Sequence, residues 1–356
     1  MKINLKKLLS MGLVVASIVL VIWIAFSNSE LENAWEALES MSPLWIAGLF
    51  LCWFAYMFFD ALSGWIYLRS EGFQISLGRA VNACLIGFYY SNITPSSAGG
   101  QPMQVNSLRK AGIPVGYGTM TATVRFICNQ FVLVVMSMAF WIANRGFVYQ
   151  QLGDAIWFVR VGWCLNFASV PLLALAAFQR NLIQRLAVGL IRLGRKIRLV
   201  RNEEAAVIST TAVLDTYHTA LRAMTRRPGQ ILVQMLCSAG SLLGCMGTTV
   251  FVYHAFGFSG TPWYHLLTLS FLLFISASYT PLPGASGAQE GGFLLFYQGI
   301  FPADRIGLAL LVWRFFTYYM FLIIGVGDVI WERILIHRDR RRKQKQAEAE
   351  GGNRAE

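Results

Sequence analysis

The feature that most constrains this chain is a helix-breaking stretch, residues 281–293, between two strongly apolar runs at residues 266–278 and 293–301. Pro283 and Gly284 disrupt a helix, because proline lacks a donor N–H and glycine has excess backbone freedom. Each apolar run is shorter than the roughly 20 residues that a membrane-spanning helix needs. Irregular backbone at membrane depth is tolerated only where protein buries it or a water-filled cavity adjoins it. We therefore expect two half-helices on either side of a break inside a membrane.

A second broken segment lies in the other half of the chain, at residues 92–102. It contains two prolines and two adjacent glycines, Pro95, Pro102, Gly99 and Gly100. Two interrupted hydrophobic segments, one in each half, are typical of transporters whose substrate site lies near the middle of the membrane. The sequence therefore predicts a midplane site between the two broken helices.

The composition is that of a polytopic membrane protein. Of the 356 residues, 56% are hydrophobic and 13% are charged, whereas a soluble domain carries about 25% charge. The net charge of +12 is concentrated in residues 179–228, with ten Lys or Arg against three Asp or Glu, and in the tail after Trp331. Basic residues gathered in loops and tails indicate cytoplasmic segments and can attract anionic lipid. We therefore expect membrane phospholipid as a partner, and no nucleic acid.

The cysteines and histidines form no recognisable site in the sequence. The six cysteines stand singly in apolar segments without a CxxC pair, and the four histidines are scattered. These patterns do not match the spacing of a metal site or a disulfide framework. Neither break fits a nucleotide-binding motif, and the serines near the breaks have no obvious His and Asp partners. We expect no metal, no cofactor and no catalytic residue.

The order of apolar segments predicts an all-α polytopic membrane protein with about six full transmembrane helices. The expected spans are residues 8–26, 43–68, 119–143, 156–178, 230–256 and 306–330. Residues 29–41 are expected to form a surface helix and residues 144–154 an outer loop. The two broken segments are expected to be re-entrant from opposite sides, as an inverted repeat requires; if both crossed fully, there would be eight spans.

A single integral-membrane domain is expected at residues 1–336. It divides into a first half at 1–178, a helical basic cytoplasmic connector at 179–228 and a second half at 229–336. Residues 337–356 are expected to be a disordered basic tail. Both termini are placed in the cytoplasm.

Glu290 is the acid that sequence reasoning places deepest in the membrane, because Asp304 and Asp328 lie near a turn and a membrane end. An ionisable group inside a bilayer costs at least about 2.5 kcal/mol, so it is normally paired or lines a cavity. One interpretation is a carboxylate that caps a half-helix, where the positive end of the helix dipole favours it. The other is a direct role in substrate or proton handling. The two roles are compatible.

Arg125 and Arg314 lie inside apolar spans, each about two turns from an end. Their side chains could extend to the interface. The sharper hypothesis pairs one arginine with Glu290 and leaves the other for a phosphate, which the guanidinium suits. Tyr318 should share a helix face with Arg314. The glycines in the breaks either allow close helix packing or expose N–H groups as an anion site.

These residues together resemble a known family. The motif residues are Asn92, Thr94, Pro95, Gly99, Gly100 and Pro102 in the first break, and Pro281, Pro283, Gly284, Gly287 and Glu290 in the second. With Arg314 and the Thr317-Tyr318-Tyr319 run, the chain resembles, over roughly residues 8–332, the flippase-like membrane family that includes the N-terminal domain of lysylphosphatidylglycerol synthase.

The resemblance implies a bacterial inner-membrane protein that handles an anionic or aminoacylated phospholipid, such as lysylphosphatidylglycerol, by moving it between leaflets. The soluble synthase domain that uses lysyl-tRNA is not expected in this chain. The expected substrate-binding residues are the motif residues listed above except Pro102, together with Arg125 and Arg314. One alternative is a phosphatidylglycerol lysyltransferase. Another is a membrane anchor for a soluble partner such as a synthase, and a homo-oligomer is also possible.

Overall fold

The computed structural model describes residues 38–196 and 203–329, together with Gly12, Val19, Trp23 and Glu36. Most of the expected first span at residues 8–26, most of the expected surface helix at 29–41 and the whole of the expected tail at 337–356 lie outside the described residues.

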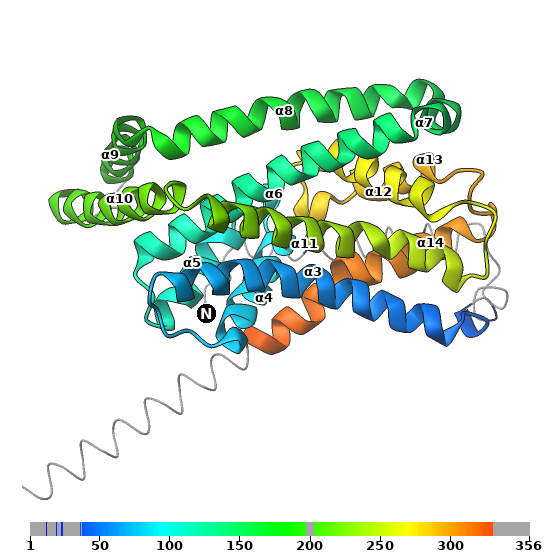
Figure 1. The fold of residues 1–356 in the computed structure, drawn as a ribbon, viewed down its shortest axis with the longest axis horizontal. Coiled ribbons are helices and arrows are strands. Elements are labelled where there is room, and N and C mark those ends of the chain that lie inside the picture. Colours follow the sequence, from blue (N-terminus) through cyan, green and yellow to red (C-terminus); the bar gives the residue numbers. More distant parts are fainter. Residues whose placement is uncertain are drawn as a thin grey trace, which may run out of the picture.

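The described part of the chain is helical, without a β-strand (Figure 1). This confirms the all-α fold. The α-helices are α3 (Pro43–Ser70), α4 (Leu77–Ile93), α5 (Gly100–Lys110), α6 (Val115–Ala143), α7 (Arg145–Leu152), α8 (Ile156–Phe178), α9 (Arg180–Lys196), α10 (Glu203–Thr225), α11 (Pro228–Ala255), α12 (Trp263–Ala277), α13 (Ala288–Phe296) and α14 (Ile306–Arg314). Three short 3-10 turns are η1 (Pro95–Ser97), η2 (Gly153–Ala155) and η3 (Pro283–Ala285), and a π-helical turn, η4 (Phe315–Tyr319), continues α14.

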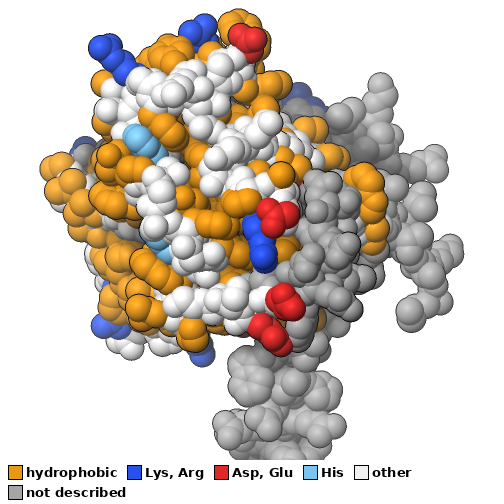
Figure 2. All heavy atoms as spheres, turned by 90° about the vertical axis from the view of Figure 1, so that its right-hand side faces the viewer, with side chains coloured by type: hydrophobic (Ala, Val, Ile, Leu, Met, Phe, Trp, Pro, Cys, Tyr) orange, Lys and Arg blue, Asp and Glu red, His pale blue; other side chains and the backbone are white. Residues whose placement is uncertain are grey.

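Among the described residues, four helices are long and apolar enough to cross a membrane: α3, α6, α11 and the helix Ile306–Val329 that contains α14. Each corresponds to a predicted span. Helix α8 has the predicted bounds but is not one of these four, so the total number of spans stays a prediction. Large hydrophobic side chains are exposed on the flanks, as lipid contact requires. A few charged side chains are scattered over the end face (Figure 2).

The expected outer loop at residues 144–154 is instead helical, because it forms α7 and the turn η2. Val148 and Leu152 lie one helical turn apart and are both buried in the main hydrophobic cluster. Two apolar side chains at this spacing fix an amphipathic helix against the bundle. The expectation of a helical connector is confirmed in the described residues, where α9 and α10 occupy most of residues 179–228.

The two halves of the chain contain the same order of elements. In each half a long helix leads to a helical hairpin broken at its tip and then to another long helix, α3 to α6 in the first half and α11 to α14 in the second. The two hairpins extend from opposite ends of the bundle (Figure 1). This arrangement agrees with the inverted repeat predicted from the two breaks.

Each broken segment folds back on itself. In the first hairpin Ser107 of α5 donates a hydrogen bond to Asn82 of α4 at 3.3 Å, so the start of α4 lies beside the end of α5. In the second, Tyr297 just after α13 donates to the carbonyl of Leu266 near the start of α12 at 3.1 Å. Both hairpins are therefore antiparallel, and the chain leaves each at the end where it entered.

The long helices α3 and α11 run antiparallel and approach closely at small residues. A Cβ atom on Gly244 would lie 2.7 Å from the backbone nitrogen of Tyr56 and 2.9 Å from the carbonyl oxygen of Cys52. A Cβ atom on Gly247 would instead lie at an ordinary 3.4 Å from the Cys52 sulfur. Close backbone approach at small residues is a main source of helix association in membranes.

We expect Gly244→Ala to destabilise the protein, because the added methyl group forces two backbones apart, an overpacking effect of about 1–3 kcal/mol. Gly247→Ala is the matched control, since it makes the same change less than one turn away without the clash. Thermal unfolding of the purified protein in detergent should show a lower transition temperature for Gly244→Ala alone. Equal transition temperatures for the two variants would contradict this account of the interface.

Candidate functional site

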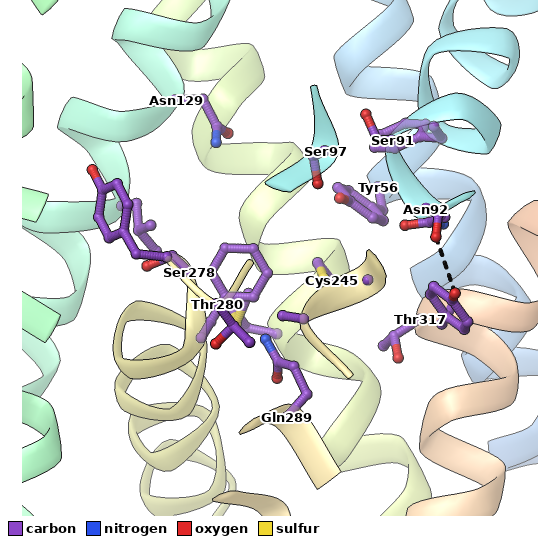
Figure 3. Close-up of a pocket in the computed structure, with 18 of the residues that line it drawn as sticks. Tyr56, Ser91, Asn92, Ser97, Asn129, Cys245, Ser278, Thr280, Gln289 and Thr317 are labelled. Carbon is purple, nitrogen blue, oxygen red and sulfur yellow. Dashed lines mark hydrogen bonds between the residues drawn. The ribbon is translucent and has the colours of Figure 1, made fainter. Parts of the chain in front are cut away.

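The tips of the two hairpins meet inside the bundle. The backbone N–H of Ser96 in the first tip donates to the carbonyl of Pro281 in the second at 3.0 Å. The Tyr318 hydroxyl on η4 donates to the carbonyl of Asn92 at the end of α4, also at 3.0 Å (Figure 3). The two breaks therefore meet, as the sequence predicted, while the position of this meeting point at the membrane midplane stays a prediction.

The two tips have closely similar sequences and turns. Residues 95–101 and 283–289 both begin with proline and end with glutamine, with small residues between them. Ser96 has φ 51° and ψ 25°, and its counterpart Gly284 has φ 60° and ψ 20°. The next residues, Ser97 and Ala285, also have positive φ, at 55° and 53°. Left-handed backbone is costly for residues other than glycine, and such strain gathers at functional sites.

Side chains and glycines define the first break. The Thr94 hydroxyl accepts a hydrogen bond from the Gly99 N–H at 2.9 Å, which closes the turn that leads into α5. A Cβ atom on Gly100 would lie 1.9 Å from the Ser91 hydroxyl oxygen and 2.7 Å from the Gly87 carbonyl oxygen. Glycine at position 100 is therefore required for α4 and α5 to approach each other.

Glu290 caps a half-helix and pairs with an arginine, as two of the hypotheses from the sequence stated, while its direct role in substrate or proton handling stays a prediction. One carboxylate oxygen accepts the N–H of Gly287 at 2.6 Å, which caps the start of α13. The other oxygen accepts from the Arg314 guanidinium at 2.7 Å. The side chains of Glu290 and Arg314 are only 2% and 4% exposed, so this is a buried ion pair. Arg314 also donates to the Gly284 carbonyl at 3.1 Å and thereby ties α14 to the tip.

Aromatic rings enclose the Arg314 guanidinium. The ring centroids of Trp313 and Tyr318 lie 5.5 and 5.2 Å from its central carbon, which is within cation–π range. The π-helical turn follows Arg314 directly and brings the Tyr318 ring onto the tip. A Cβ atom on Gly284 would lie 2.1 Å from that ring. As predicted, Tyr318 and Arg314 share one side of the helix.

Arg125 is not at the meeting point of the tips. Its guanidinium forms an ion pair with Asp60 of α3 and donates to Gln104 of α5 at 2.8 Å. The Cys84 thiol of α4 also lies 2.9 Å from the Asp60 carboxylate. Both arginines thus have a carboxylate partner, so the picture of one paired arginine and one left for a phosphate does not match this geometry.

A cavity of about 430 Å³ lies where the tips meet. Hydroxyl and amide side chains from both halves line it, together with aromatic and other apolar side chains. Asn129 of α6 and Gln289 of α13 point toward it from opposite sides (Figure 3). The polar lining residues are Tyr56, Ser91, Asn92, Ser96, Ser97, Asn129, Gln130, Ser270, Ser278, Tyr279, Thr280, Gln289, Thr317 and Tyr318, and Arg314 is the charged one among the described lining residues.

The structure brings most of the predicted site residues to this region. Asn92, Gly284 and Arg314 line the cavity, whereas Thr94, Pro95, Gly99, Gly100, Pro281, Pro283, Gly287 and Glu290 shape the two tips around it. Their role in binding a substrate stays a prediction. Sequence reasoning missed Asp60, whose signal was an isolated acid inside an apolar span, and it missed Asn129 and Gln289.

Comparisons with known proteins agree with this architecture. A family described as the lysylphosphatidylglycerol synthase TM region matches residues 9–325. A protein of Archaeoglobus fulgidus described as a UPF0104 membrane protein is 24% identical over 314 residues, which are 87% of this chain and 93% of the relative.

We expect Arg314→Met to be strongly destabilising, because it leaves the buried Glu290 carboxylate without its cation. Removing one partner of a buried pair costs about 3–5 kcal/mol. The double variant Arg314→Met with Glu290→Gln should recover part of this loss, since no unpaired charge then remains. Thermal unfolding in detergent would measure both variants.

Arg305→Met provides the control for this cycle. Arg305 is 33% exposed and pairs with the largely exposed Asp304, so its loss should cost less than about 1 kcal/mol. A double variant no more stable than Arg314→Met would show that the uncompensated charge is not the cause.

Proposed function

This chain belongs to the family of the lysylphosphatidylglycerol synthase TM region, and we propose that it moves a membrane phospholipid between leaflets. The head group would occupy the cavity between the two hairpin tips, while the acyl chains stay in the bilayer. The observation that carries this proposal is the 430 Å³ cavity, lined in part by hydroxyl and amide side chains, where two oppositely directed, broken hairpins meet.

The polar lining supports a lipid head group as the ligand. The flanks of the bundle are apolar, whereas hydroxyl and amide side chains line its internal cavity. This contrast favours a polar group as the ligand of the cavity. Buried polar groups are otherwise costly and are normally satisfied within the protein. Arg314 supplies a guanidinium at the cavity wall, a group suited to a phosphate.

The architecture supports alternating access to this site. Transporters with inverted repeats bind at the repeat interface and expose the site by moving one repeat against the other. Here lining residues come from α3, α4 and α6 of the first half and from α11, α12, α13 and α14 of the second. A relative displacement of the two halves would open the cavity toward one leaflet or the other.

The family name suggests phosphatidylglycerol or its lysyl derivative as candidate substrates. The location that we propose is a bacterial inner membrane, with both termini in the cytoplasm because the basic segments are expected there. In this proposal Arg314 faces the phosphate and Glu290 balances the charge of Arg314. Lipid analysis also tests the lysyltransferase alternative. A new lipid species, made by this chain in a host that lacks aminoacylated lipids, would favour the lysyltransferase function over lipid movement.

The proposal predicts that closing the cavity stops lipid movement. Asn129→Trp and Thr280→Trp place a bulky ring in the cavity from opposite sides. In vesicles that contain tail-labelled phosphatidylglycerol, a membrane-impermeant quencher reports the fraction of lipid in the outer leaflet. The unmodified protein should raise the quenched fraction above that of protein-free vesicles, and both variants should abolish the increase.

Val135→Trp is the matched control on the same helix as Asn129. Val135 is 49% exposed on the outside of α6, so a ring there leaves the cavity open and movement should continue. If Asn129→Trp and Thr280→Trp, shown by thermal unfolding to be folded, moved lipid at the original rate, the cavity would not be the route.

A further inference from the structure

Helix α9 has the sequence of a basic amphipathic helix. Between Arg180 and Lys196 there are five Lys or Arg and no Asp or Glu, and leucines recur at positions 182, 186, 190 and 193. Recurrence every three or four residues places apolar side chains along one face of a helix. Helices that combine such an apolar face with Lys and Arg on the polar face are typical of those that lie in a membrane surface.

The structure exposes an apolar strip and a basic strip of α9 side by side. Leu182 and Leu186 lie one helical turn apart and are 40% and 58% exposed. Arg185 and Arg192 lie two turns apart on the neighbouring strip and are exposed as well. Helix α9 contacts α8 and α10, and Ile191, on the opposite side from Leu182, is half-buried. Packing against the rest of the bundle therefore leaves both strips open.

The position of α9 indicates that the bilayer covers this surface. Helix α8, a predicted span, runs along the bundle, and α9 begins at Arg180, just after the end of α8 at Phe178. Helix α9 turns across the direction of α8 (Figure 1). A helix that lies across the spans, at the end of one of them, is parallel to the membrane surface. Exposed Leu165 and Phe167 on α8 lead toward the exposed leucines of α9 along an apolar surface.

The arginines specify the chemistry of the partner. Lys and Arg beside a membrane surface are attracted by anionic lipids, and a guanidinium binds phosphate oxygens through several donors at once. Residues 179–228 carry ten Lys or Arg against three Asp or Glu, so the whole connector favours an anionic partner. A second copy of this chain would bring the same positive charge against α9. A leaflet with negatively charged head groups matches both strips.

We propose that α9 is a docking helix for an anionic leaflet. Leu182 and Leu186 insert among the acyl chains, while Arg185 and Arg192 bind the phosphate groups of anionic phospholipids. This site is separate from the cavity between the hairpin tips and does not depend on lipid movement. Helices α9 and α10 connect the two halves of the chain, so docking fixes that connection in the membrane surface.

The test places a polarity-sensitive fluorophore on α9 of the full-length protein. Cys164 is exposed and the other five cysteines are buried, so Cys164→Ser with Leu186→Cys directs the label to position 186. Nanodiscs contain phosphatidylcholine alone or with phosphatidylglycerol, and a lipid with a nitroxide near its head group quenches a label inside the bilayer. We expect blue-shifted, quenched emission that is stronger with phosphatidylglycerol and weaker at high salt, because salt screens exposed charges.

Asn181→Cys is the matched control for the position of the label. Asn181 is exposed on the same helix, five residues from Leu186 and hence about 140° around the helix from it. A label at position 181 should stay in water and resist quenching by the nitroxide lipid.

Arg185→Gln should weaken the response of the position 186 label to phosphatidylglycerol. One arginine near an anionic surface changes the ratio of inserted to free helix on the order of fivefold, so more phosphatidylglycerol should be needed for equal quenching. Arg160→Gln is the matched control, since Arg160 is exposed toward the other end of α8. It removes the same charge and should leave the response unchanged.

Three results would overturn the proposal. An unshifted, unquenched label at position 186 in both lipid mixtures would show that α9 stays outside the bilayer. Blue-shifted emission without nitroxide quenching would show that protein, from a second copy or another partner, covers the leucines. Equal quenching with and without phosphatidylglycerol would show that docking needs no anionic lipid. Each readout is independent of lipid movement, so the proposed function is tested separately.

Discussion

The buried ion pair between Glu290 and Arg314 is the interaction on which the geometry of the second tip depends. A single carboxylate caps α13 and binds the guanidinium, and the same guanidinium holds the Gly284 carbonyl. The start of α13, the tip and α14 are thereby joined by two side chains. In a membrane interior each of these groups would be costly alone, so they are favourable only as a set. This explains why a helix break and a charged residue occur together in the sequence.

In the first half, different residues close the hairpin tip and link the hairpin to the long helix that follows it. Thr94 closes its tip in place of a carboxylate, and Arg125 binds Gln104 on the second helix of the hairpin. The carboxylate partner of Arg125 is Asp60, which comes from α3 and not from the hairpin. Each half thus links the helix after its hairpin to that hairpin through an arginine. The architecture is repeated, while the source of the negative charge differs.

Sequence reasoning predicted the all-α fold, most long helices, both breaks and the pairing of Glu290 with an arginine, because proline, glycine and isolated charges leave local signals. It predicted α7 as a loop, since the burial of Val148 and Leu152 depends on tertiary packing. It also missed the wall residues Asn129 and Gln289. Uncharged amides are common in helices, and only the three-dimensional arrangement shows that these two line a cavity.

The placement of the charges bears on how the halves could move. Glu290 and Arg314 both belong to the second half, and Asp60 and Arg125 both belong to the first. Displacement of one half against the other would therefore separate neither pair, which avoids the large cost of an unpaired charge in the membrane. The tips themselves are joined by the Ser96 to Pro281 and Tyr318 to Asn92 hydrogen bonds, which are neutral. Neutral contacts of about 1 kcal/mol each can be exchanged for others during movement. The interface between the tips is thus the part of this buried polar network that can open at the lowest cost.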